Sequence, residues 1–240
     1  MRGMTSFPST TTPLYGFDIE TQTSRENPQA GLNPSLSHVT AVAVTSVAEV
    51  TVTTGPTRSP HGGAATQGVF IGSESHIFTH SQRWLDREPP GILVSWNGAA
   101  FDIPFLIDRG MGGWAYTPNS SLPTKYGTLP GWEDATSAAW ILDGQIRHVH
   151  VDIAGLYAAE CQREGVRWGL KDAARTFLGV EPVEVDRERM HTLSEGELVT
   201  YVASDAEVTA ELAYRVHEQV VAHAEAEYIR LVNLMARLKQ

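Results

Sequence analysis

The chain has 240 residues, of which 42% are hydrophobic and 19% are charged, and its formal net charge is −10. This length and apolar content are sufficient to bury a core, and they argue against wholesale disorder. The acidic balance argues against a protein that binds its partner through a broad basic face. It does not exclude an enzyme that contacts a few phosphates through metal ions and local side chains.

The sequence carries no signal for export or for a membrane. Cys161 is the single cysteine, so the chain can form neither an internal disulfide nor a cysteine zinc cluster. Residues 1–12 are rich in Ser and Thr and lack a continuous apolar segment, which predicts a flexible N-terminal tail rather than a secretory signal. No segment has the ~18 apolar residues of a membrane span. We therefore expect a soluble, cytoplasmic protein with no membrane partner.

Hydrophobic periodicity predicts an alternation of strands and helices. Apolar and β-branched segments predict strands over residues 13–20, 38–46, 49–54, 68–72, 92–96 and 147–153. Helical spacing and capping residues predict helices over residues 73–87, 100–109, 154–164 and 170–178, and from Ser194 onwards, where Ser194 and Glu197 match a capping box. Residues 110–137 are rich in Gly, Pro and Ser, which predicts an insertion or a long ordered loop. This order of elements is typical of an α/β fold with a mixed sheet.

The first predicted strand, LYGFDIET, ends in two carboxylates. Side chains alternate along a strand, so Asp18 and Glu20 point to the same side. Two carboxylates on one face repel each other unless a cation holds both, and hard divalent ions prefer such oxygens. A strand-end metal site is one interpretation. The other is a strand that simply runs out into solvent.

Two further motifs place polar side chains at the ends of predicted elements. Asn97, Phe101 and Asp102 follow the strand at residues 92–96, at a crevice where ligands of α/β sheets gather. Alternatively, Asp102 favours the helix N-terminus by its charge and Phe101 fills the core. Tyr201 and Asp205 stand one turn apart on the last long helix, where they form either part of a site or a plain surface pair.

Taken together and in this order, FDIET, NGAAFD and YVASD resemble the three motifs of the DEDD superfamily of 3′–5′ exonucleases, in the subtype with tyrosine in its third motif. The sequence is most similar to the proofreading exonuclease domain of family-B DNA polymerases and to its stand-alone relatives. The segment WGLKDAARTFLG at residues 168–179 resembles the helix before the third motif. The resemblance implies a ribonuclease-H-like fold, with a five-stranded mixed sheet flanked by helices, over residues 13–218. Residues 219–240 form a C-terminal helical extension, which packs either on its own domain or on a partner.

The resemblance also implies a catalytic centre with two divalent metal ions, Mg²⁺ or Mn²⁺. Their ligands would be Asp18, Glu20, Asp102 and Asp205. By resemblance, Asp18 bridges both ions, Glu20 and Asp205 hold the ion on the nucleophile side, and Asp102 serves the other. Tyr201 orients the attacking water, because a phenol with a pKa of ~10 is a poor base at neutral pH.

Substrate contacts are expected to be local. Phe101 can stack on a terminal base, Asn97 can hydrogen-bond the end nucleotide, and Thr21 can meet the 3′ end. The expected substrate is single-stranded DNA with a free 3′ end, cut to nucleoside 5′-monophosphates, with a separate polymerase or repair protein as a partner. RNA or a short oligonucleotide is the alternative substrate, and an inert nucleic-acid-binding domain is the alternative to an enzyme.

Other titratable residues have weaker assignments. His148, His150 and Asp152 share one face of a predicted strand, which indicates either a transition-metal site or, more simply, a half-exposed strand face. Asp152 also stands where a helix-capping acid is expected. Lys171 and His191 are candidates for phosphate contacts.

Overall fold

The structure is a computed structural model, and it describes residues 12–22, 31–46, 67–117 and 137–237. Within these residues, seven strands form one mixed sheet in the order β3-β2-β1-β4-β7-β6-β5. The strands are β1 (Leu14–Thr21), β2 (Val39–Ser46), β3 (Gln67–Ile71), β4 (Gly91–Ser95), β5 (Trp114–Thr117), β6 (Ser137–Leu142) and β7 (Gln145–Asp152).

Strand β1 lies inside the sheet, between β2, which follows it in sequence, and β4, which is distant in sequence. It runs antiparallel to β2 and parallel to β4, and β4 runs parallel to β7. The remaining pairs, β2 with β3, β6 with β7 and β5 with β6, are antiparallel. The prediction of a mixed α/β fold is therefore confirmed.

The prediction of five strands is wrong, because β5 and β6 extend the sheet beyond β7. Part of the loop predicted at residues 110–137 is strand β5, whose Trp114 pairs with Trp140 of β6. The two indoles meet edge to face, with ring centroids 5.3 Å apart. A strand as short as WAYT, preceded by two glycines, shows no clear alternation in sequence, and only this cross-strand pairing makes it part of the sheet.

Three sequence predictions fall outside the described residues. They are the strand at residues 49–54, residues 1–11 of the predicted tail and residues 118–136 of the predicted loop.

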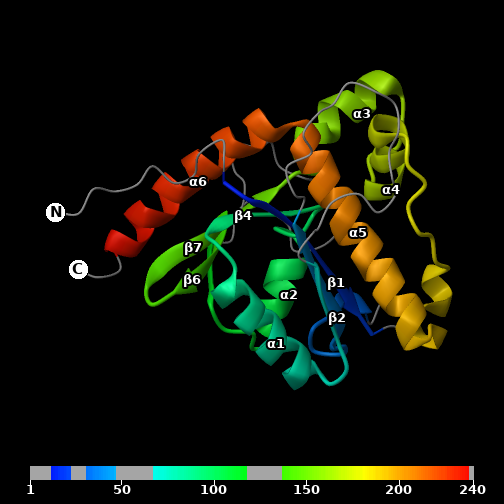
Figure 1. Cartoon of the computed structure of the whole chain (residues 1–240), viewed down its shortest axis with the longest axis horizontal. Helices are drawn as coiled ribbons and strands as arrows, with labels where there is room; N and C mark the ends of the chain where they lie inside the picture. Colours follow the sequence, from blue (N-terminus) through cyan, green and yellow to red (C-terminus); the bar gives the residue numbers. More distant parts are fainter. Residues whose placement is uncertain (1–11, 23–30, 47–66, 118–136, 238–240) are drawn as a thin grey trace.

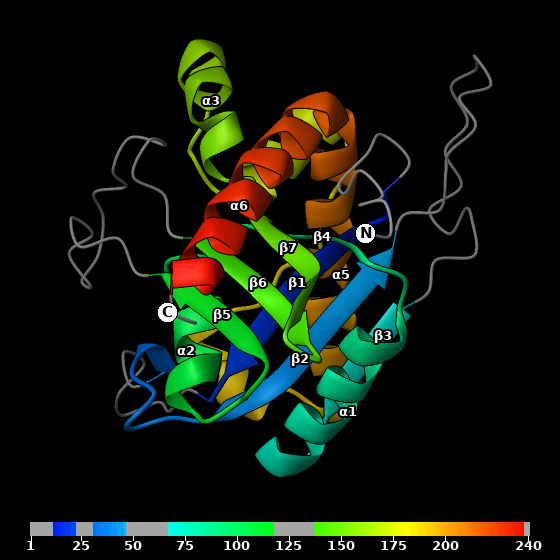
Figure 2. The ribbon, with the colours of Figure 1, turned by 90° about the vertical axis from the view of Figure 1, so that its left-hand side faces the viewer.

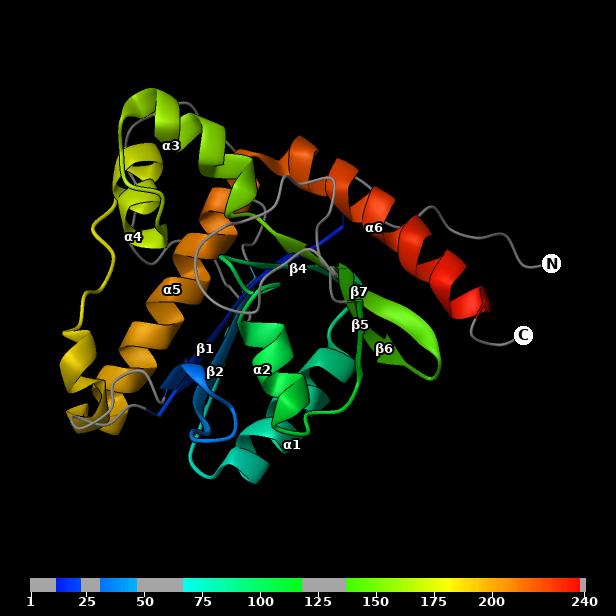
Figure 3. The same cartoon turned by 180° about the vertical axis from the view of Figure 1, so that it is seen from behind.

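Helices cover both faces of the sheet. The long ones are α1 (Glu74–Arg87), α5 (Glu195–Arg215) and α6 (His217–Arg237), and the short ones are α2 (Asp102–Asp108), η3 (Gly155–Tyr157), α3 (Ala158–Glu164), α4 (Leu170–Ala173), η4 (Ala174–Leu178) and η5 (Arg187–Thr192). Figures 1 and 2 show α1 and α2 on one side of the sheet and α5 and α6 on the other. Seen from behind, α3 and α4 lie beside α5 (Figure 3).

The helix ends follow the capping rules. The Ser73 side chain accepts a hydrogen bond from the His76 amide at the start of α1, and Ser194 and Glu197 form a complete capping box at the start of α5. The helix predicted from residue 100 begins two residues later, because residues 97–101 form a turn. None of the described helices combines the length and the hydrophobicity that crossing a bilayer requires.

The two faces of β1 belong to different cores. Tyr15, Phe17 and Ile19 pack with α1 and α2 in an aromatic-rich core. Leu14 belongs to a second core with α5 and α6. Val220, Ala224 and Leu231 of α6 are fully buried in or beside that core. Residues 217–237 therefore pack against the sheet of their own chain, although Ile229 is 60% exposed.

Candidate metal centre

The position of the first two carboxylates follows from the alternation along β1. Phe17 and Ile19 point into the aromatic-rich core, so Asp18 and Glu20 point to the opposite face, under α5. Both are half-buried. The strand therefore presents a pair of acids to one helix.

Gly16, on the same face of β1, determines how closely that helix approaches. A Cβ atom at Gly16 would overlap the carbonyl oxygen of Ala206 and lie 2.9 Å from the Ala210 Cβ atom. Only glycine leaves room for the α5 backbone to lie directly on the strand. Because Asp205 precedes Ala206, this close approach brings its carboxylate to Asp18 and Glu20.

Ligand oxygens of Asp18, Glu20 and Asp205 all lie within 4.8 Å of one another. Among the described residues, no other three His, Cys, Asp or Glu side chains come together in this way. Asp205 is buried. Three carboxylates at this separation could hold a metal ion, because a divalent cation offsets their mutual repulsion.

Asp102 faces the same centre from α2, although it lies outside that group of three. It is 5% exposed and is the first residue of the helix. Burial raises the pKa of Asp102 well above its ordinary value, and the charge of Asp18 raises it further. Its Oδ2 atom is buried and accepts no hydrogen bond from the described residues. A buried carboxylate oxygen of this kind, beside other acids, fits a divalent cation as its partner.

The turn that precedes Asp102 is stabilised by hydrogen bonds to the Asp152 carboxylate. The Asn97 amide donates to Asp152 Oδ1 at 2.9 Å, and the Ala99 amide donates to Oδ2 at 3.2 Å. The Ala154 amide adds a third bond, to Oδ1, at 3.1 Å. Burial raises the pKa of Asp152 to about 6, against the opposing effect of these hydrogen bonds. Asp152 thus anchors a turn, as a capping acid would.

Two residues of the turn have backbone roles. Asn97 takes a left-handed conformation with φ of 66°, which asparagine tolerates better than most residues. A Cβ atom at Gly98 would overlap the Ser95 hydroxyl and lie 2.8 Å from Asp102 Oδ2. The glycine of the NGAAFD motif therefore leaves the space that the Asp102 carboxylate occupies.

The interpretation of His148 and His150 as part of a half-exposed strand face is wrong, because both are buried. His148 Nδ1 accepts the Gly91 amide at 3.2 Å, and its Nε2 lies 2.7 Å from the Leu85 carbonyl oxygen. His150 Nε2 lies 2.7 Å from Ser95 Oγ, which also accepts the Gly98 amide. These rings stabilise neighbouring strand ends and turns. Among the described residues they join no group that could hold a metal.

Helix α5 brings Tyr201 and Asp205 to the centre on one face, and both are buried. Lys171 joins them from the first turn of α4. Its Nζ forms an ion pair with Asp205 Oδ1 and lies 4.6 Å from the centroid of the Tyr201 ring. Sequence reasoning gave Lys171 a phosphate contact at most. The structure places this cation against one of the candidate ligands.

The predicted substrate contacts lie around this centre in different environments. The buried Thr21 hydroxyl donates to the Gly31 carbonyl at 2.6 Å. Asn97 is exposed, and Phe101 is half-buried with its ring 5.5 Å from that of Phe105. His191 is exposed in η5. The roles of Thr21, Asn97 and Phe101 toward a substrate stay predictions.

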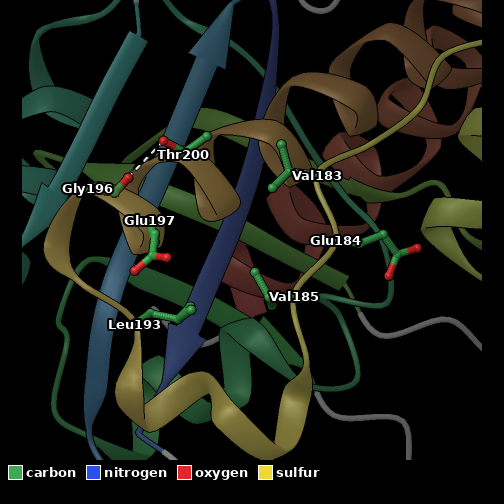
Figure 4. A pocket seen from close by; sticks show the side chains of 7 residues that line it. All are labelled: Val183, Glu184, Val185, Leu193, Gly196, Glu197 and Thr200. Carbon is green, nitrogen blue, oxygen red and sulfur yellow. Dashed lines mark hydrogen bonds between the residues drawn. The ribbon is translucent and has the colours of Figure 1, made fainter.

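A pocket of about 290 Å³ lies away from these acids, between residues 183–185 and the first turns of α5 (Figure 4). Its polar side chains are engaged elsewhere. Glu197 belongs to the capping box, Thr200 Oγ1 donates to the Gly196 carbonyl at 2.8 Å, and Glu184 is turned away toward Arg175. We assign the pocket no role.

The fold is similar to part of a solved DNA polymerase. The chain matches the family B DNA polymerase from the hyperthermophilic archaeon Pyrobaculum calidifontis with a TM-score of 0.53 and 18% sequence identity. The match covers 89% of this chain and 25% of the polymerase chain, so this chain spans about a quarter of the length of that protein. No family model matches the sequence, and no curated protein matches it. At this identity the comparison establishes a shared fold.

Sequence reasoning missed the two glycines that bring the acids together, and it named Lys171 only as a candidate phosphate contact. Gly16 leaves space for the backbone of α5, and Gly98 leaves space for the Asp102 carboxylate. Lys171 places a cation against Asp205. The sequence did point to the two glycines, since Gly16 stands in LYGFDIET and Gly98 in NGAAFD, the motifs that carry the candidate ligands. The contact of Lys171 with Asp205 had no such signal, because it depends on how α4 docks against α5.

Proposed function

We propose that this chain is a metal-dependent 3′–5′ exonuclease that removes nucleoside 5′-monophosphates from single-stranded DNA. The observation that carries the proposal is the convergence of Asp18, Glu20 and Asp205, with Asp102 facing them, from three separate elements. The order of their motifs resembles that of the tyrosine-containing DEDD exonucleases. The shared fold with a family B DNA polymerase supports the proposal independently.

The sheet supports the finer, ribonuclease-H-like assignment. Five adjacent strands, β3-β2-β1-β4-β7, form a mixed arrangement with helices on both faces. On this interpretation, β6 and β5 are additions at one edge. They lie on the side of β7 away from β1, so they leave the acidic centre unchanged.

Asp18, Glu20, Asp102 and Asp205 would hold the metal ions. Two divalent ions, Mg²⁺ or Mn²⁺, would activate a water and stabilise the leaving 3′ oxygen. The acids supply the negative charge that fixes such ions in place. The turn anchored by Asp152 keeps Asp102 in position, since residues that hydrogen-bond around a metal site orient its ligands.

On this proposal, Tyr201 positions the attacking water and Lys171 contacts the scissile phosphate. The Tyr201 hydroxyl would orient the attacking water, because Tyr201 stands one turn before Asp205 on the buried face of α5. Lys171 carries a positive charge at Asp205, where it can contact an oxygen of the scissile phosphate. Phe101, Asn97 and Thr21 would position the terminal nucleotide.

The experiment uses 5′-labelled single-stranded DNA and RNA of the same sequence with Mg²⁺, with Mn²⁺ and with EDTA. We expect a ladder of progressively shortened DNA that requires metal and is abolished by EDTA. A faster ladder on RNA would assign an exoribonuclease instead. If neither nucleic acid is shortened with either metal, the enzyme assignment fails and a binding domain of the same fold remains.

The matched variants are Asp205→Asn and Asp143→Asn. The first removes a ligand charge from the centre. The second removes the same charge from the turn between β6 and β7, far along the sheet from β1. Loss of the ladder in the first variant alone ties the activity to the acidic centre. Equal activity of both variants would place the reaction elsewhere.

A further inference from the structure

Trp168 is a large aromatic side chain that the folded core does not use. It is 39% exposed, and it is the one aromatic residue among the exposed large hydrophobic side chains of the described segments. Its indole is nevertheless fixed, because Nε1 donates to the Ala154 carbonyl oxygen at 2.7 Å. An exposed tryptophan held in this way presents a rigid π-face to solvent.

The sheet register places Trp168 near the acidic centre. Gly16 of β1 pairs with Val94 of β4, so Asp18 is level with the residue after the end of β4. Ser95 pairs with Asp152 of β7, so Ala154 lies just beyond that same level. Two strand spacings of about 4.8 Å separate β1 from β7, so the backbone at Ala154, which anchors the indole, lies roughly 10 Å across the sheet from the β1 backbone.

The neighbours of Trp168 place it on the correct face of the sheet. Val166 and Leu170 pack against the core that contains α5, which is the face to which Asp18 points. Three residues after Trp168, Lys171 contacts Asp205. The sheet register and the docking of α4 therefore place the indole beside the centre independently. Arg167, the preceding residue, is exposed and adds a positive charge.

We infer that Trp168 is a stacking platform for one base of the bound single strand, close to the 3′ end. This inference rests on the proposed function and extends it to how the substrate is held. Base–aromatic stacking tolerates any sequence, as an exonuclease requires. A chain with a net charge of −10 has little general attraction for phosphates, so contacts to bases carry more of the binding.

The test combines protein variants with substrates that lack single bases. Trp168→Ala removes the platform, and Trp168→Phe keeps an aromatic face but loses the indole N–H. Ile229→Ala, which removes an exposed apolar side chain from α6, is the control. Each variant is assayed on single-stranded DNA with all its bases, or with one abasic nucleotide at the first, second or third position from the 3′ end.

For Trp168→Ala we expect KM to rise about 5- to 150-fold with little change in kcat, the range given by the stacking of one base. Trp168→Phe should recover most of the loss, and Ile229→Ala should behave as wild type. At one of the abasic positions, wild type should lose affinity while Trp168→Ala loses nothing further, because both changes remove the same contact.

Additive losses at every abasic position would overturn the inference, as would an unchanged KM in Trp168→Ala. So would a Trp168→Phe variant as impaired as Trp168→Ala with an equally lowered melting temperature, since that pattern indicates a structural role of the indole N–H. Fluorescence anisotropy of the same oligonucleotides in EDTA separates the two proposals. If DNA is shortened but the effects of Trp168→Ala and of every abasic position are additive, only the stacking role of Trp168 is wrong. If one abasic position and Trp168→Ala have non-additive effects on Kd but no DNA is shortened, only the exonuclease proposal is wrong.

Discussion

The two faces of β1 differ in what they pack against and in how tightly. One face carries large rings, with Tyr15 and Phe17 set against Trp84 and Trp114 at centroid separations of 5.5 and 5.9 Å. The other face has no side chain at Gly16, so α5 rests on the strand backbone. The first face gains stability from buried aromatic area. The second lacks such packing and brings the acids together. One face of β1 therefore contributes to stability, and the other forms the candidate metal centre.

The largest expected effect is on catalysis, from Asp18→Asn on the α5 face. Removing the charge of this proposed ligand should lower turnover by at least about 10²-fold, since losing even a residue that only orients a metal ligand costs ~10–100-fold. The melting temperature without metal should stay the same or rise, because Asp18 adds to the repulsion at Asp102. Single-turnover rates and thermal melts test this. Wild-type turnover in this variant would contradict the assignment of the centre.

Lys171→Met tests how the α5 face is stabilised without metal. The substitution leaves the buried Asp205 carboxylate without its ion-pair partner, which should lower the free energy of unfolding by about 3–5 kcal/mol. Added Mn²⁺ should raise the melting temperature of the variant more than that of wild type, because a bound cation replaces the missing charge. Equal Mn²⁺ shifts in both proteins would show that Asp205 does not contribute to metal binding.

On the aromatic face, the expected effect is a pH dependence through His148, whose ring lies edge-on to Tyr15. Burial lowers the pKa of His148 to about 4, and the charge of Arg147 lowers it while that of Asp86 opposes this. The folded protein binds this proton less readily than the unfolded chain does. The contribution of neutral His148 to the free energy of unfolding is therefore fully present above pH ~6.5. It falls by roughly 3 kcal/mol as the pH drops to about 4.

Urea unfolding from pH 7 to pH 4 in wild type and in His148→Gln isolates this contribution. Burial also lowers the pKa of His150, to about 3, so the difference between the two proteins is the relevant quantity. We expect the curve of the variant to be flatter. Parallel curves would show that His148 is not the group responsible.

The smallest expected effect on stability comes from two substitutions at adjacent positions of β1, which differ in their expected effect on activity. Gly16→Ala forces α5 away from the strand and should cost about 1–3 kcal/mol through overpacking, together with most of the activity. Phe17→Leu should cost about 1 kcal/mol and leave kcat unchanged. Urea unfolding and kcat on DNA measure both. If Phe17→Leu reduced kcat as much as Gly16→Ala, the two faces would not be independent.

Sequence periodicity predicted the strands and helices better than it predicted the contacts between them. Alternation predicted that Asp18 and Glu20 share a side, and the structure brings both to Asp205. The same rule failed at His148 and His150, because alternation does not reveal that both faces of a central strand are covered. Strand β5 was missed because its pairing depends on a partner more than 20 residues away. Lys171 was undervalued because helix docking has no local signature.

The close contact at Gly16 also determines when the centre can exist. Asp18 lies near the beginning of the described chain and Asp205 near its end, so their meeting is one of the most non-local contacts in the fold. Because the loop-closure entropy must be paid before such a contact stabilises the fold, we expect it to form late. During folding, the sheet can be nearly complete while the acids are still apart. We therefore expect the proposed nuclease activity to return during refolding only with this last docking step, after the rest of the molecule has folded.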